Sequence, residues 1–210
     1  MTAGRGQGGR TGLIGGSIGA ALRQRGWHVT GRDQRDGAAE QAHELGVLDA
    51  VGVDPDAELT FVATPVGAIA AEGSAALSQT AGVVTDVGSV KAPLAELMGN
   101  PRFVGGHPMA GSELEGVAGA DPAMFEGAVW VLTPTGQTSD EAFGLVSRVV
   151  SSFGAEVRAL RPDRHDQLVA LVSPVPHLTA VTLMGQAAER AEEHRALLRL
   201  AAGGFRDMTR

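Results

Sequence analysis

Residues 1–22, MTAGRGQGGRTGLIGGSIGAAL, are the most informative part of the sequence for the architecture, and their two halves point in different directions. From Gly12 onward, a glycine turn leads into an apolar helix, which is typical of the loop that holds a dinucleotide pyrophosphate. Such a loop follows a buried apolar strand, yet residues 1–11 contain no Val, Ile, Leu or Phe. We therefore expect that this segment is not the native first strand. On this reading the chain is a truncated or frame-shifted form with poor stability, weak cofactor binding and little activity.

The composition is that of a soluble globular protein, with 43% hydrophobic and 20% charged residues. The net charge of −7 argues against a nucleic-acid or anionic-membrane partner, because both require a basic face. The absence of Cys excludes disulfides and thiolate metal sites, and we expect a cytoplasmic protein. The apolar run from Leu168 to Met184 contains two prolines and a histidine, which predicts a buried, kinked helix rather than a membrane span.

Beyond Gly12, short β-like runs alternate with helical ones, which predicts an α/β fold with a doubly wound parallel sheet. The expected strands cover residues 27–33, 59–65, 82–91, 102–111, 128–134 and 155–162. The expected helices cover residues 17–25, 38–45, 69–77, 93–98 and 140–153, and two more follow at 163–190 and 191–202. The pattern predicts a dinucleotide-binding domain over residues 1–162 and the start of an all-helical domain over residues 163–210.

The glycine turn matches the dinucleotide fingerprint G-x-G-x-x-G in part. Gly12 and Gly15 occupy its second and third positions, whereas Arg10 stands where the first glycine belongs. Gly16 and Gly19 are expected to allow close packing between the helix and a strand. The helix N-terminus would present free N–H groups and the positive end of its dipole to a phosphate.

An acidic residue stands where the fingerprint requires one for the ribose hydroxyls. Asp33 ends the next expected strand, about 20 residues after Gly12. Because a carboxylate repels a 2′-phosphate, NAD is favoured over NADP. Arg32 and Arg35 flank Asp33 and can soften that preference.

Seven sequence blocks occur in order along the chain: TGLIGGSIGAAL, FVATP, TDVGSVK, FVGGHPMAGSE, FEGAVWVLTP, RHDQLVALVSPVPH and AAGGFRDMTR. Over residues 12–210 they resemble the prephenate dehydrogenase family, which has the arogenate dehydrogenases as close relatives. The resemblance implies a Rossmann-like doubly wound sheet followed by the start of an all-helical dimerisation domain. It also implies NAD-dependent oxidative decarboxylation of prephenate to 4-hydroxyphenylpyruvate in tyrosine biosynthesis, and a homodimer. Composition and periodicity alone predict only the architecture.

The resemblance assigns roles to individual residues. His107 matches the catalytic histidine that accepts the proton of the substrate hydroxyl, and Ser89 matches the serine that orients it. Arg210 matches the arginine that receives a substrate carboxylate. His177 matches a histidine of the substrate pocket. Glu113 and Asp207 match acidic residues that would pair with that arginine and gate entry. The cofactor contacts implied are Gly12, Leu13, Ile14, Gly15, Asp33, Thr64, Pro65 and Gly88.

The residues alone leave other interpretations open. His107 could be a turn histidine beside a proline, Ser89 a helix cap, and Glu113 a solvated surface charge. Four histidines outside the expected pocket are expected to be structural or exposed: His28, His43, His165 and His194. Because they lack metal-ligand spacing, no metal site is expected.

Three departures separate this sequence from the family pattern. Arg10 replaces the first glycine, and Pro174 stands where the family usually has the histidine of an S-H-x-P-H block. The family also continues beyond Arg210 through helices that complete the pocket and form the dimer. A non-catalytic remnant of the enzyme is therefore one alternative. Another is a nicotinamide enzyme of the β-hydroxyacid dehydrogenase type, which leaves GGHPMAGSE and GGFRDMTR unexplained.

Overall fold

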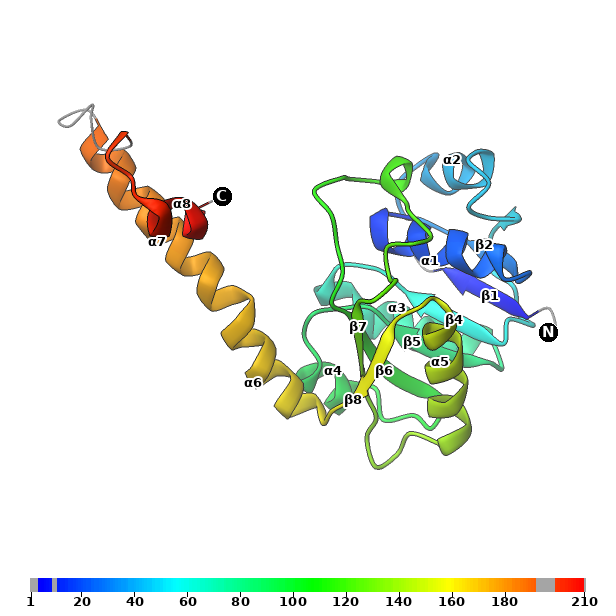
Figure 1. Ribbon diagram of the computed structural model, residues 1–210. Coiled ribbons are helices and arrows are strands. Elements are labelled where there is room, and N and C mark those ends of the chain that lie inside the picture. The colour runs from blue at the N-terminus through cyan, green and yellow to red at the C-terminus, as the bar shows by residue number, and fades with distance from the viewer. Residues whose placement is uncertain (1–3, 9–10, 192–198, 210) are drawn as a thin grey trace. The chain divides into compact units, whose positions relative to one another are not determined.

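The computed structural model describes residues 4–8, 11–191 and 199–209, and the chain divides into two compact units, Met1–His165 and Asp166–Arg210. The first unit contains an eight-stranded sheet with helices packed on it (Figure 1). Its strands are β1 (Arg5–Gly8), β2 (His28–Gly31), β3 (Ala50–Val51), β4 (Leu59–Val62), β5 (Val83–Asp86), β6 (Phe103–Pro108), β7 (Val129–Thr133) and β8 (Glu156–Ala159). Its helices are α1 (Leu13–Gln24), α2 (Ala38–Glu44), α3 (Val66–Gln79), α4 (Ala92–Leu97), the 3₁₀ turn η1 (Val117–Gly119), α5 (Asp140–Ser152) and the start of α6 (Pro162–Val172).

The strand order is β3-β2-β1-β4-β5-β6-β7-β8, and β1 to β6 run parallel. This order confirms the expected α/β, doubly wound class. The sheet departs from a parallel arrangement at one point, where β7 runs antiparallel to β6. Residues 109–128 connect these strands with only η1 between them, and without a crossover helix the chain returns in the opposite direction.

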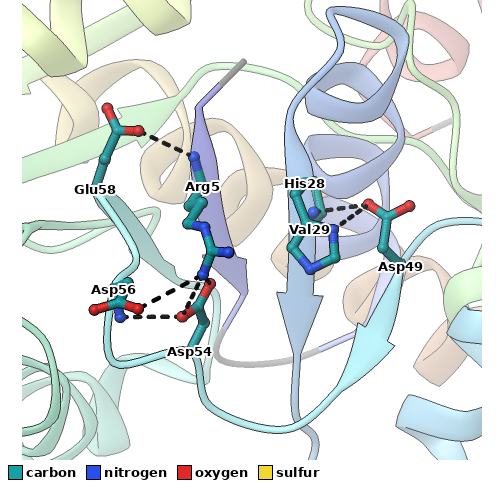
Figure 2. A network of polar contacts seen from close by, with 7 residues as sticks. All are labelled: Arg5, His28, Val29, Asp49, Asp54, Asp56 and Glu58. Atoms are coloured by element: carbon teal, nitrogen blue, oxygen red, sulfur yellow. Dashed lines mark hydrogen bonds and ion pairs between the residues drawn. The ribbon is translucent and has the colours of Figure 1, made fainter.

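The expectation that residues 1–11 contain no first strand is wrong, because β1 lies at the centre of the sheet. It pairs with β2 on one side and β4 on the other through backbone groups, which do not depend on the side chains. The Arg5 side chain stays half exposed and pairs with Asp54 at 3.1 Å and Asp56 at 3.8 Å, so no unpaired guanidinium is buried. Figure 2 shows this network, in which Glu58 also accepts the backbone N–H of Arg5 at 3.3 Å.

Neighbouring apolar side chains supply the packing that the glycines of this segment lack. A Cβ added to Gly4 would lie 2.6 Å from the indole of Trp27, and one added to Gly6 would lie 3.1 Å from Leu22. Both apolar residues therefore pack directly on the backbone of the strand. In contrast, a Cβ at Gly8 would meet nothing within 4 Å. Residues 9–10, with the unusual Arg10, lie outside the described residues.

Two apolar clusters cover the sheet. The larger one joins α1, η1 and α5 to the strands around a group of buried rings, namely Phe61, Phe125, Trp130 and Phe153. The smaller one places α3 and α4 against β4, β5 and β6. Gly16 and Gly19 were expected to pack closely on a strand, but they pack on other segments. A Cβ on Gly16 would lie 3.0 Å from Ala120, next to η1, and a Cβ on Gly19 would lie 3.0 Å from Val47, in the segment after α2.

The second unit contains the rest of α6, α7 (Pro174–Ala191) and α8 (Gly203–Thr209), which packs on α7. The helix expected at 191–202 falls largely on residues 192–198, outside the described residues. The apolar run was expected to be buried, and that expectation is wrong for its large side chains. Its large side chains are 38–64% exposed: Leu168, Leu171, Val172, Val175, Leu178, Val181 and Met184. The stretch Pro162–Arg190 could span a bilayer by length and composition alone, which for a single helix is weak evidence.

Candidate functional site

The strand order reverses between β1 and β4, which makes the carboxyl ends of these strands the switch point of the sheet. The chain winds outward from β1 through β2 to β3, and then crosses back to β4 and continues the other way. At such a switch point the loops after the two central strands diverge, and open α/β sheets bind ligands there. The cofactor residues expected from the sequence follow the carboxyl ends of β1, β2, β4 and β5 and so belong to one edge of the sheet.

The backbone of residues 12–15, at the start of α1, is open to a ligand. Gly12 precedes the helix in an extended conformation and accepts the N–H of Gly16 at 2.7 Å. A Cβ on Gly12 would meet nothing within 4 Å. Residues 12–15 are all partly exposed, so a ligand can approach the backbone N–H groups of the first helical turn. The turn thus has the open backbone that a pyrophosphate requires.

Asp33 follows β2 with its carboxylate held from two sides. The backbone N–H and the hydroxyl of Thr11 donate to Asp33 Oδ2 at 2.9 and 3.1 Å, and the backbone N–H of Arg35 donates to Oδ1 at 2.9 Å. The Arg35 guanidinium lies 3.3 Å from the same carboxylate. Burial alone would raise the pKa of Asp33, but the hydrogen bonds from Arg35 and Thr11 outweigh it and lower the pKa to about 2. The group is therefore ionised near neutral pH.

The arginine on the other side of Asp33 is also paired. Arg32 Nη2 lies 2.7 Å from Glu72 Oε2 on α3, and Gln34 Nε2 donates to Glu72 Oε1 at 3.0 Å. Both arginines that flank Asp33 therefore already contact a carboxylate.

The turn after β4 contributes a hydroxyl at the switch point. Thr64 is 8% exposed, and within the described part of the chain its Oγ1 is buried without a hydrogen-bond partner. Pro65 caps the start of α3. A buried hydroxyl without a partner carries a desolvation cost, which a polar ligand atom would remove.

A buried ion pair fastens the loop after β5 to β6. Lys91, 1% exposed, hydrogen-bonds Asp86 and also donates to the Gly106 carbonyl at 2.9 Å. Asp86 accepts the N–H of Gly106 at 3.1 Å and the N–H of Gly88 at 2.8 Å. Burial raises the pKa of Asp86, while Lys91 and the two backbone donors act in the opposite direction. The pair holds the loop that carries Ser89 against the residue before His107.

His107 lies near the end of β6, opposite Val131 of β7. Its Nδ1 lies 2.9 Å from Nε2 of His165, and the two rings meet edge to face with centroids 5.1 Å apart. His165 is fully buried in α6. His165 was expected to be a structural or surface residue, and its contact with His107 was not predicted.

The other expected site residues are distributed over both units. Ser89 is exposed in the loop after β5, and Glu113 is exposed in the loop before η1. In the second unit, His177 is an exposed residue of α7 and Asp207 an exposed residue of α8. Arg210 lies outside the described residues.

The switch point of the sheet, the open glycine turn and the ionised Asp33 define a nucleotide-binding domain of the doubly wound class. Comparison with known proteins then fixes the family. The family model "Prephenate dehydrogenase, nucleotide-binding domain" matches residues 18–159, and "Prephenate dehydrogenase, dimerization domain" matches residues 161–210. The chain therefore belongs to the prephenate dehydrogenase family, as the resemblance predicts.

Individual relatives agree with this assignment. Prephenate dehydrogenase of Bacillus subtilis is 34% identical over 95% of this chain, and the chain spans 58% of that relative. The structure of Aquifex aeolicus prephenate dehydrogenase in complex with hydroxyphenyl propionate and NAD+ matches 100% of this chain and 78% of its own, with 29% identity and a TM-score of 0.88. Synechocystis arogenate dehydrogenase matches 98% of this chain and 78% of its own, with 31% identity and a TM-score of 0.85.

Three residues of the site were not predicted from the sequence: Asp86, Lys91 and His165. For Asp86 and Lys91 the sequence does contain a signal. Lys91 is the only lysine in the chain and follows a buried strand within five residues of Asp86. That placement favours an internal partner over a solvated charge. No comparable signal pointed to His165, because its partner is 58 residues away and the pattern around it is that of an ordinary helix.

Proposed function

We propose that the protein is an NAD-dependent dehydrogenase that converts prephenate to 4-hydroxyphenylpyruvate by oxidative decarboxylation. One observation carries the proposal: the Asp86–Lys91 pair after β5 holds the backbone of Gly106, the residue before His107, in the sheet whose strand order reverses between β1 and β4. NAD, when bound, would accept the hydride from the carbinol carbon of the substrate.

The residues of the chain would perform the remaining steps. His107 accepts the hydroxyl proton as the carbonyl forms, and Ser89 orients the histidine. The ring carboxylate then leaves as CO₂, and the electron pair of the broken C–C bond restores aromaticity as a phenolate. The phenolate oxygen takes up one proton, equivalent to the one that His107 accepted, which gives the hydroxyphenyl product and returns His107 to its neutral form. Arg210 and His177 receive the substrate, with Glu113 and Asp207 at its entrance; the family resemblance supports these four roles.

The cofactor position follows from the carboxyl edge of the sheet. The pyrophosphate would lie on the turn formed by residues 12–15, and the ribose hydroxyls would donate to Asp33. Thr64, Pro65 and Gly88 would line the nicotinamide half of the cofactor site. The pairing of Arg32 with Glu72 and of Arg35 with Asp33 supports NAD over NADP, because both arginines that flank Asp33 already contact a carboxylate.

The assembly we propose is a homodimer in the cytoplasm. The match to a dimerisation domain and the exposed apolar side chains along α6 and α7 support it. Covering these side chains with a second copy would remove apolar surface from water. Sedimentation or light scattering on the purified chain should give a dimer mass, and a monomer at micromolar concentration would contradict the proposal.

Arogenate is a second candidate substrate, favoured by the similarity to the Synechocystis arogenate dehydrogenase. The test is a titration of the purified chain with NAD by calorimetry, followed by NADH formation with prephenate and with arogenate. Turnover of either substrate identifies the activity and its substrate. Binding of NAD without turnover indicates a non-catalytic remnant, and failure to bind NAD refutes the proposal.

The role of His107 is tested by His107→Asn. Because general bases contribute ~10²–10⁴-fold, kcat should fall by that order while the affinity for NAD stays nearly unchanged. The control is His43→Asn, which changes an exposed histidine of α2. A His107→Asn variant with near-normal kcat would remove His107 from the chemistry.

A further inference from the structure

A fully buried histidine contacts the proposed base through the nitrogen that the reaction does not use. His165 Nε2 lies 2.9 Å from His107 Nδ1, within hydrogen-bond distance for two ring nitrogens. We infer that His165 is a positioning residue that accepts a hydrogen bond from Nδ1–H of His107 and so fixes the tautomer in which His107 Nε2 carries the lone pair. The catalytic role of His165 rests on the proposed function, whereas the hydrogen bond and the tautomer of His107 do not.

Only one proton can lie between the two ring nitrogens when both imidazoles are neutral. A neutral imidazole has one N–H donor and one acceptor nitrogen, so a hydrogen bond between two neutral imidazoles contains a single proton. If His107 donates from Nδ1, its Nε2 has the lone pair that a base needs. If His165 donates instead, His107 Nε2 carries the hydrogen and cannot accept one. Only the first arrangement is compatible with His107 as the base.

The setting of His165 holds this contact in place. The His165 side chain is 0% exposed, so water does not compete for its ring nitrogens. Its backbone N–H donates to the carbonyl of Arg161 at 2.9 Å, within the first turns of α6. The two rings meet at an interplanar angle of 73°, so that the edge of one faces the other. The orientation of His107 is thus set by a buried side chain of α6 rather than by solvent.

The chemical identity of the partner also has a consequence. A carboxylate in place of His165 would orient His107 equally well, but its negative charge would strengthen the hold of His107 on a proton. A neutral imidazole orients the base without adding a negative charge to the site. Since prephenate carries two carboxylates, a neutral orienting group also avoids repulsion with the substrate.

The first experiment reads the tautomer directly and needs no activity. Long-range ¹H–¹⁵N correlation spectra of the full chain distinguish protonated from unprotonated ring nitrogens, and His107→Asn and His165→Gln assign the two rings among the six histidines. We expect His107 to be protonated at Nδ1 and His165 to be unprotonated at Nε2. The opposite tautomer of His107 would overturn the inference, whether or not the chain turns over substrate.

The second experiment separates positioning from folding. His165→Gln keeps an acceptor oxygen near the place of Nε2, whereas His165→Leu has similar bulk and no acceptor. We expect kcat to fall by roughly 10- to 100-fold in the leucine variant, a part of the ~10²–10⁴-fold supplied by a general base, and to be largely retained in the glutamine variant. KM and the dissociation constant of NAD should change less than about twofold.

The outcomes are distinguishable from one another. Equal loss in both variants, or loss of NAD affinity in parallel with kcat, would show a merely structural role and overturn the inference, as would a leucine variant with normal kcat. His43→Gln, which changes an exposed histidine, should leave kcat unaltered. If the wild-type chain oxidises neither prephenate nor arogenate, the proposed function fails, while the tautomer of His107 still decides whether the pair is formed as inferred.

Discussion

Replacing Lys91 with Met should remove the ion pair that fastens β6 to the loop after β5. The change keeps the aliphatic stem but deletes the ammonium, which donates to Asp86 and to the Gly106 carbonyl. Breaking a buried pair by removing one partner typically costs 3–5 kcal/mol. Asp86 keeps two backbone donors, and burial already raises its pKa, so it can accept a proton when Lys91 is gone. We therefore expect a loss of unfolding free energy near the low end, about 3 kcal/mol.

Urea unfolding followed by the fluorescence of Trp130 measures this loss, because that indole is buried in the core next to β6. The matched control is Arg161→Met, which removes an exposed ion pair with Asp163 at 3.1 Å. Surface pairs of this kind contribute about 0–1 kcal/mol. The double variant Lys91→Met, Asp86→Asn should recover at least about 1 kcal/mol, since it no longer leaves a carboxylate without its cation.

The same substitution should lower kcat more than it lowers the affinity for NAD, because it loosens the strand that carries His107 rather than the turn at Gly12. A Lys91→Met protein that is no less stable than Arg161→Met would refute the reasoning. So would a double variant less stable than Lys91→Met alone.

Three further predictions follow from other parts of the first unit. Gly8→Ala should stabilise the chain by about 0.5–1 kcal/mol in urea unfolding, since its Cβ enters open space, whereas Gly4→Ala should destabilise it, because its Cβ would lie 2.6 Å from an indole. The pKa of Asp33 is lowered to about 2 from an ordinary 3.8. Its contribution to the free energy of unfolding is therefore present above pH 3.8 and is lost as the pH falls through 2. Allowing for solvent screening, that contribution is about 1 kcal/mol, and Asp33→Asn should flatten acid unfolding over this range. Glu72→Gln should release Arg32 and tighten NADP binding about tenfold in calorimetry, with NAD binding little changed; equal effects on both cofactors would contradict this.

Much of the fold could be predicted from the sequence because periodic apolar runs bounded by glycine and proline determine most elements from Gly12 to Ser152, apart from the two-residue strand β3 and the short turn η1. The first strand could not, since its stability lies in its neighbours. Backbone pairing with β2 and β4 does not need apolar side chains, and the indole of Trp27 fills the space that the glycines leave. A pattern that counts only the residues of the strand itself therefore misses it.

Some residues of the candidate site could likewise be predicted from the sequence, and others could not. Gly12, Asp33 and Thr64 follow the ends of parallel strands, a position that the sequence pattern predicts and that brings them to one edge. The contact between His107 and His165 depends instead on where α6 begins relative to β6, which is a tertiary matter. Long-range contacts between single polar residues carry no periodicity, so only the structure reveals them.

The single lysine has one more consequence, which concerns chemical labelling. Amine-reactive reagents can modify only Lys91 and any free N-terminal amine, and Lys91 is 1% exposed. The rate at which Lys91 becomes acylated therefore measures how often the connection between the β5 loop and β6 opens to solvent. Mass spectrometry of one peptide follows that rate without a spectroscopic probe. A ligand that binds at the carboxyl edge of the sheet should slow the acylation, so the chain carries its own reporter of occupancy at a residue that the ligand does not need to touch.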